Sequence, residues 1–449
     1  MKTIAATALV LTTMATSPLT ALAQGEDAPS PTPVAAPAAP VANELPVPEA
    51  PSAPAVTETP ASLAVPPPVL QLASPNLVPV ETLPAPVALA KPATGLLLPS
   101  GFVLTPSGYV RTLFSFINED EAQTDYVGRY DGFQMLNARL AFEATRDNTT
   151  IGVSLEGAYD RRDAMNTSEG SVEVQLRDAF ISYHAYRFLH LTAGQLKVPF
   201  AAEEATPTPE LVFTDVAVSS RGVRGVEGYN ADGLSFDRRV GLKLSSDRLY
   251  LSDEEGLGLR YALTLSNGNS PASPLNDNET LAYTARLEAS WGQIITLGLG
   301  ADHNEVTSGS PPDALTEKQL SLAGDLAVDA FGAHLLVQYL RRIDEPKDVP
   351  SDAKISAQGF HAQVSYEAPY GLVPAYRFSL LDPSVDVTET DAATQGRLDT
   401  DDVRVHTLGL GWNVPDEPFA VKVNYHVVLE DAARKLSNDR LDVLLQGAF

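Results

Sequence analysis

The stretch FAVKVNYHVVL, Phe419–Leu429, alternates between apolar and polar side chains over 11 residues. Its apolar face holds Phe419, Val421, Val423, Tyr425, Val427 and Leu429, and its polar face holds Lys422, Asn424 and His426. A period of two is that of a β-strand with two different faces. Strands of soluble sheets usually run for ~5–6 residues, whereas a tilted membrane-spanning strand needs ~9–11. The length therefore predicts a strand that crosses a membrane.

The same alternation recurs from Gly101 to the last residue, and each run ends near Gly, Asn, Asp or Pro. It predicts sixteen strands, at about 108–118, 133–146, 149–161, 173–186, 188–199, 237–247, 257–267, 279–291, 292–302, 318–329, 331–343, 356–368, 371–381, 402–414, 418–430 and 439–449. Single-chain bacterial barrels have an even number of antiparallel strands. A barrel of about sixteen strands leaves an aqueous lumen, which one of eight does not. We therefore predict an all-β fold, a transmembrane antiparallel barrel over residues 101–449.

The N-terminal residues 1–23 have the features of a cleaved signal peptide. Lys2 supplies the positive charge, and Ile4–Met14 is apolar but shorter than the ~20 residues that span a bilayer as a helix. The sequence Ala21-Leu22-Ala23 fits the small-x-small cleavage rule. No later run of apolar residues is long enough for such a helix, which leaves a barrel as the way to cross the membrane.

Residues 24–100 are rich in proline and alanine and hold 19 of the 35 prolines. Proline removes backbone donors and stiffens the chain, so we expect a disordered periplasmic linker without a core. The linker is either a spacer that reaches the cell wall or an unselected tail. The net charge of −26 argues against a nucleic-acid partner, and the lack of cysteine excludes disulfides, thiol catalysis and thiolate metal sites.

The last predicted strand ends on Phe449, with Leu441, Val443 and Leu445 on the same face. A terminal Phe on an alternating strand resembles the signal read by the bacterial barrel-assembly machinery, although Gly447 stands where many such proteins have an aromatic residue. We expect Phe449 to be this assembly signal. The expected location is the bacterial outer membrane, with its lipid and lipopolysaccharide as further partners and residues 24–100 in the periplasm.

Residues 173–268 resemble the phosphate-selective porin O and P family. The resemblance rests on LRDAFISY (Leu176–Tyr183), GQLKVPF (Gly194–Phe200), DRRVGLKL (Asp237–Leu244) and LTLSNGN (Leu263–Asn269), of which GQLKVPF is the most specific. It implies a sixteen-stranded porin, a homotrimer, and a long loop folded into the lumen to form a constriction. It also implies a passage for phosphate or similar anions.

The long connection that would be this loop is Ala201–Phe236, directly after GQLKVPF. A structureless connection of 36 residues is unusual unless it is functional or disordered. Arg221 and Arg224 are its candidates for facing a passing anion. Its carboxylates outnumber them and put phosphate selectivity in doubt: Glu203, Glu204, Glu210, Asp215, Glu227 and Asp232.

Basic residues also occur on the polar faces of the predicted strands. With Lys197 of GQLKVPF, these pore-lining candidates are Arg111, Arg139, Arg239, Lys243, Arg260, Arg286, Arg342, Arg377 and Lys422. The same faces carry Glu143, Glu156, Glu288, Asp325, Glu367, Glu430 and Asp442. Fixed cations attract anions, and Arg binds phosphate or carboxylate in a bidentate fork. The alternative is that these cations pair with the carboxylates and only stiffen the wall.

Catalysis finds little support in the sequence. No metal-binding H-E-x-x-H or H-x-x-x-H pair and no G-x-S-x-G motif occurs, and a Ser-His arrangement is conceivable only around His426. We therefore predict a passive porin for small hydrophilic solutes with a modest anion preference, without cofactor, metal or enzymatic activity. The alternatives are a structural barrel that anchors the envelope through its Pro-rich arm, and a barrel enzyme.

Overall fold

The computed structural model describes residues 95–118, 132–158, 173–223, 231–251, 256–268, 276, 278–308, 314–347, 354–385, 402–430 and 438–449. The predicted signal peptide, residues 24–94 of the predicted linker, Arg224 and Glu227 lie outside these ranges. The end of the predicted linker is described and includes a short strand, β1 (Leu96–Leu97). This strand pairs with Val103 and Leu104 at the start of the next one.

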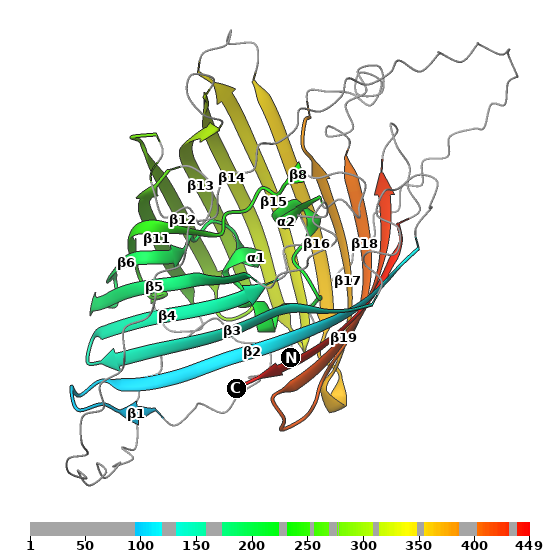
Figure 1. Ribbon diagram of the computed structural model, residues 1–449, viewed down its shortest axis with the longest axis horizontal. Helices are drawn as coiled ribbons and strands as arrows, with labels where there is room; N and C mark the ends of the chain where they lie inside the picture. Colours follow the sequence, from blue (N-terminus) through cyan, green and yellow to red (C-terminus); the bar gives the residue numbers. More distant parts are fainter. Residues whose placement is uncertain are drawn as a thin grey trace, which may run out of the picture. The chain divides into compact units, whose positions relative to one another are not determined.

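Sixteen antiparallel strands form a closed barrel, which confirms the predicted fold (Figure 1). They are β2 (Val103–Ile117), β3 (Gly132–Arg146), β4 (Thr149–Ala158), β5 (Glu173–Tyr186), β6 (Leu189–Lys197), β9 (Arg238–Ser245), β11 (Leu257–Asn267), β12 (Leu281–Trp291), β13 (Ile295–Ser308), β14 (Leu315–Ala330), β15 (Ala333–Pro346), β16 (Ile355–Tyr366), β17 (Leu372–Asp382), β18 (Val403–Asn413), β19 (Phe419–Glu430) and β20 (Arg440–Ala448). Each overlaps one predicted strand. The barrel closes where β2 pairs with β20, from Tyr109 opposite Ala448 to Ile117 opposite Arg440.

Strand boundaries differ from the prediction where a turn interrupts the alternation. Strand β13 begins at Ile295 and not at residue 292, because Gly292 adopts a left-handed conformation with φ of 58° and reverses the chain after Trp291. Such a φ suits glycine, which has no Cβ to clash. The strand then continues to Ser308, beyond the predicted end at residue 302, because its polar residues keep pairing with β14.

Short turns alternate with long connections along the chain. Two residues separate β3 from β4, β5 from β6, and β14 from β15, whereas the connections after β6 and β17 are long. Two small elements occupy other connections: β10 (Leu249–Tyr250) precedes β11, and the 3-10 turn η3 (Pro369–Gly371) precedes β17. Bacterial barrels have short periplasmic turns and longer external loops, so this alternation fits the same architecture.

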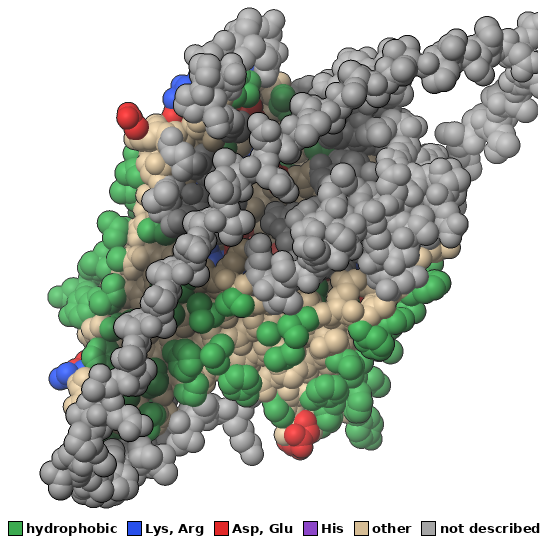
Figure 2. Space-filling view, viewed as in Figure 1, with side chains coloured by type: hydrophobic (Ala, Val, Ile, Leu, Met, Phe, Trp, Pro, Cys, Tyr) green, Lys and Arg blue, Asp and Glu red, His purple; other side chains and the backbone are tan. Residues whose placement is uncertain are grey.

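The two faces of the wall have opposite character, as the period of two predicted. On β12, Tyr283, Leu287 and Trp291 point outward and are exposed, whereas Arg286 and Glu288 point inward and are buried. The outer flank visible in Figure 2 is largely apolar. A soluble protein would place its apolar side chains inside, so this inversion is that of a wall surrounded by lipid.

The connection Val198–Asp237 is called here the luminal segment, and its described residues, 198–223 and 231–237, fold into the barrel interior (Figure 1). It contains α1 (Ala202–Ala205), the 3-10 turn η1 (Thr208–Glu210), α2 (Val218–Arg221) and a two-residue hairpin of β7 (Gly222–Val223) and β8 (Ala231–Asp232). Its position agrees with the expectation that the residues after GQLKVPF enter the lumen.

Candidate pore and luminal segment

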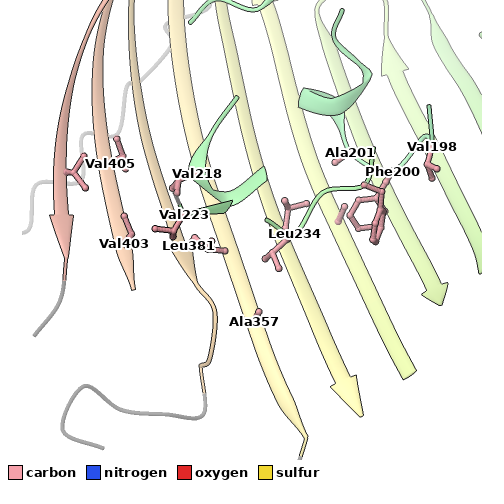
Figure 3. Close-up of a cluster of buried hydrophobic side chains, with 14 residues drawn as sticks. Val198, Phe200, Ala201, Val218, Val223, Leu234, Ala357, Leu381, Val403 and Val405 are labelled. Atoms are coloured by element: carbon pink, nitrogen blue, oxygen red, sulfur yellow. The ribbon is translucent and has the colours of Figure 1, made fainter. Parts of the chain in front are cut away.

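An apolar cluster holds the luminal segment against one side of the wall (Figure 3). The segment contributes Val198, Phe200, Ala201, Val218, Val223, Leu234 and Phe236, and the wall contributes Ala323, Leu340, Ala357, Leu381, Val403, Val405 and Val428. The wall residues belong to β14–β19 and occupy inward positions, which the alternation rule reserves for polar side chains in a water-filled barrel. This side of the lumen is therefore packed and not open to solution.

Glycines in the wall make room for the segment. A Cβ at Gly359 of β16 would lie 2.7 Å from Cβ and 3.2 Å from Cα of Ser219 in α2. A Cβ at Gly300 of β13 would overlap the carbonyl oxygen of Phe200. Both positions require glycine because the segment backbone approaches the wall too closely for any other residue.

Four predicted pore-lining cations bind main-chain carbonyls of the segment. Arg111 donates to the carbonyl of Thr214 at 2.6 Å, Arg286 to that of Phe200 at 2.9 Å, and Arg377 to that of Asp215 at 2.9 Å. Lys422 donates to the carbonyls of Leu211 and, at 3.3 Å, Pro209. Carbonyls of an irregular segment need donors when they are buried, so these cations act as anchors for the segment.

Most of the predicted wall cations pair with carboxylates, and Arg286 does so in addition to its bond to Phe200. Arg239 forms a bidentate pair with Asp302 at 2.7 and 3.2 Å, and Arg286 forms one with Asp325 at 2.8 and 2.9 Å. Further pairs are Arg139 with Asp178, Arg342 with Asp344 at 2.9 Å, and Arg260 with Glu288 at 3.8 Å. Paired charges of opposite sign cancel at a distance, so these cations contribute little to the field in the lumen.

The alternation rule missed two inward cations, Arg177 and Arg238, and a third, Arg440, lies on the polar face of the last predicted strand but was not among the candidates. Arg177 is the extra residue of a bulge in β5, because Ser154 pairs with Asp178 and Leu155 with Leu176. It lies 3.1 Å from Glu156 and 2.8 Å from Asp237, and Arg238 lies 2.9 Å from Asp178. Arg440 pairs with Asp442 at 3.1 Å. The charged doublets Arg177-Asp178 and Asp237-Arg238 were the available signal, since strict alternation would place half of each doublet in lipid.

The candidates in and beside the segment have different partners. Arg221 is only 7% exposed, lies 3.5 Å from Asp215 and donates to the carbonyl of Gly222. Lys197 lies within electrostatic range of Glu204 and Asp237. Lys243 on β9 has neither a carboxylate nor a hydrogen-bond acceptor within reach among the described residues.

The acidic residues of the segment are mostly internal to it. Glu203 accepts hydrogen bonds from the backbone N–H of Ala217 at 2.9 Å and from Ser220 at 2.5 Å, and also faces Arg377 at 3.4 Å. Glu204 is buried, neither of its side-chain oxygens has a hydrogen-bond partner among the described residues, and burial raises its pKa to about 8. Glu203 therefore holds the segment together, and neither carboxylate is presented to passing ions.

A cavity of about 560 Å³ remains between the turn η1 of the segment and the wall formed by β2–β5. Its inward-facing lining includes Tyr109, Arg139, Glu143, Phe180 and Glu210. Burial raises the pKa of Glu210. Charged side chains of both signs therefore line this cavity together with apolar side chains.

Two histidines form arrays that resemble parts of hydrolytic sites. Thr407 Oγ1 lies 3.0 Å from His426 Nδ1, and His426 Nε2 lies 3.3 Å from Asp442. Ser219 Oγ lies 3.1 Å from His361 Nδ1. A nucleophile must be reachable by its substrate, and all five side chains are buried in the wall or under the segment. The arrays therefore cross-link the structure and offer no support for the enzyme alternative.

Neither a long apolar helix suited to crossing a bilayer nor a group of three or more potential metal ligands occurs among the residues that the structure describes.

Comparison with solved structures identifies the fold. The chain is similar to the outer membrane channel DcaP of Acinetobacter baumannii, with 15% identity over 79% of this chain and 99% of DcaP and a TM-score of 0.53. It is also similar to an anion-selective porin from Comamonas acidovorans, with 14% identity over 77% of this chain and 99% of that porin and a TM-score of 0.50. No protein-family model and no curated protein matches the chain. The likeness establishes the porin fold, and the resemblance to the phosphate-selective porin O and P family stays a prediction.

Proposed function

We propose that this chain is a passive porin of the bacterial outer membrane that admits small hydrophilic solutes. The observation that carries the proposal is the packing of the apolar cluster of the luminal segment against one side of the wall. This cluster contacts β14–β19, and a cavity whose lining includes charged side chains of both signs remains against β2–β5. A structural barrel has no need for an open side, and an enzyme needs an accessible nucleophile.

The preference among solutes follows from the pairing of the wall charges. Most wall arginines are neutralised by Asp302, Asp325 and similar carboxylates, so we expect a modest anion preference and no strict phosphate filter. Residues 1–23 as a signal peptide, 24–100 as a periplasmic linker, the homotrimer, and contacts with lipopolysaccharide and the barrel-assembly machinery belong to the same proposal. Its passive character means that no cofactor and no energy source are required.

Conductance of the purified protein in planar bilayers tests this function. Stable ohmic channels are expected, and removal of residues 205–230 of the luminal segment should increase their conductance. A matched control removes residues 386–401 from the connection between β17 and β18. Absence of any conductance would favour the structural alternative, and an unchanged conductance after removal of residues 205–230 would show that the segment does not limit the pore.

A further inference from the structure

The stretch GQLKVPF begins with two residues, Gly194 and Gln195, that have no part in the pore as described so far. Gly194 has a φ of 125°, and a Cβ there would overlap the carbonyl oxygen of Ala179 on β5. Only glycine therefore allows β6 to approach β5 this closely. The next residue, Gln195, stands opposite Ala179 and is the last residue of β6 that pairs with β5.

Gln195 lies on the outer face of the wall although its side chain is polar. It shares this face with Leu191 and Ala193, and Leu191 is exposed on the outside of the barrel. Leu176 and Leu155, which pair with each other on the same face, are exposed as well. The surroundings of Gln195 are thus apolar and face lipid, where an amide without a hydrogen-bond partner is costly.

The partners of the Gln195 amide lie in the bulge of β5. Its Nε2 donates to the carbonyl oxygen of Leu176 at 2.6 Å and to that of Arg177 at 3.1 Å. Successive carbonyls of a regular strand point to opposite sides, so a single amide reaches both only because the bulge turns them the same way. The pairing of β5 with β6 ends at Ala179, so the side chain of Gln195 replaces the missing backbone donor.

The inner side of the same bulge carries charges into the lumen. Arg177 lies 2.8 Å from Asp237, the last residue of the luminal segment. Asp178 lies 2.9 Å from Arg238, the first residue of β9. The bulge therefore ties the end of the luminal segment to β5.

We propose that Gln195 is a positioning residue of the pore: from the outer face of the wall it fixes the bulge of β5 and so holds Arg177 against Asp237. This inference rests on the proposed porin function and gives a role to the first two residues of GQLKVPF. Gly194 provides the close approach of the strands, and Gln195 provides the donor. Without that donor, the end of the luminal segment detaches from β5 intermittently.

Single-channel recording of the full-length protein in planar bilayers tests this inference, because detachment of the luminal segment appears as partial closures. Gln195→Met keeps the size of the side chain but removes the donor. It is expected to raise the frequency of partial closures by about tenfold, which corresponds to the loss of one or two hydrogen bonds. If Gln195→Met does not assemble, Gln195→Asn, whose shorter amide cannot reach both carbonyls, takes its place.

The matched control is Gln358→Met on β16. The amide of Gln358 also lies on the outer face, but it donates to the side chain of Asp382 at 3.3 Å, and β16 pairs in unbroken register with β15 and β17. This substitution should leave the frequency of partial closures unchanged.

A double-mutant cycle separates positioning from general stabilisation. Arg177→Met should raise the frequency of partial closures by a similar factor, and Gln195→Met should add nothing once Arg177 is replaced, because Gln195 acts through it. Asp237→Asn gives the same comparison if Arg177→Met does not fold. Multiplied effects in the double variant, or parental behaviour of Gln195→Met channels, would overturn the inference and leave the porin function intact. No conductance in the parent protein would overturn both.

Discussion

Substitution of Gly359 by alanine tests whether the luminal segment is fixed by its contact with the wall. The added Cβ would lie 2.7 Å from Cβ of Ser219 in α2, and carbon atoms in contact are normally at least about 3.5 Å apart. The segment must therefore retreat by about 0.8 Å. Because β16 pairs with β15 and β17 along most of its length, the wall is expected to hold its place and α2 to move.

Displacement of α2 has a calculable cost. Overpacking of this kind costs about 1–3 kcal/mol, and retreat of Ser219 weakens its hydrogen bond to His361, worth about 1 kcal/mol. A total of about 3 kcal/mol changes the equilibrium constant between the packed and the displaced position of the luminal segment by about a hundredfold. The luminal segment is then expected to lose its contact with the wall intermittently.

Single-channel recording measures this directly. Gly359→Ala should show more current noise and frequent partial closures, while the barrel keeps its heat-modifiable migration in gels. The matched control is Gly324→Ala on β14, where an added Cβ would meet only Leu299, at 3.9 Å. Quiet channels of parental conductance in Gly359→Ala would refute the view that this close contact fixes the segment.

Three further substitutions test the closure between β2 and β20, the luminal segment and the wall. Phe449→Ala removes a ring that is 60% exposed and packs over Gly108 at the β2–β20 closure; it should slow assembly, measured as the heat-modifiable fraction over time, and cost at most about 1.5–3 kcal/mol of stability. Assembly at the parental rate would contradict this role. Glu204 has a folded-state pKa of about 8, above its ordinary 4.5, so the stability of the parent should fall as the pH rises from about 4.5 to about 8. Glu204→Gln should abolish that fall, at most about 5 kcal/mol, in melts at several pH values; equal pH dependence in both proteins would count against it. Arg239→Gln leaves Asp302 buried without its partner and should cost about 3–5 kcal/mol in thermal melts, yet shift the reversal potential less than Lys243→Gln does. A larger shift would mean that this pair is not neutral.

The strands were predictable because one physical requirement acts on every residue of the wall. On β12 and β19 each residue faces either lipid or lumen, so a period of two runs through the sequence without interruption. The location of the luminal segment was predictable in part, from its length and from its place after GQLKVPF. The apolar surface of the wall on which the segment packs was not predictable. Its residues, such as Leu340 and Leu381, interrupt the polar face of the strands and look like errors in the alternation.

The alternation rule could not predict which carboxylate pairs with which arginine. A bulge at Arg177 brings two consecutive residues, Arg177 and Asp178, to the same side, which a strict period of two does not allow. Cross-strand register decides which carboxylate meets which arginine, and an error of one residue reverses every face. The sequence therefore identifies the inward cations but not those that remain unpaired.

This distinction determines how ion preference arises in such a barrel. A list of lumen cations suggests a strongly positive channel, yet Arg239 and Arg286 each lie in bidentate contact with a buried carboxylate. Charges more than a Debye length of ~8 Å from a passing ion are largely screened at physiological salt, so the net charge of −26 does not decide the matter. The charges that act on a passing ion are those that no opposite charge pairs with. Lys243 lies opposite two threonines, has no carboxylate partner in the described wall, and is the clearest such unpaired charge there.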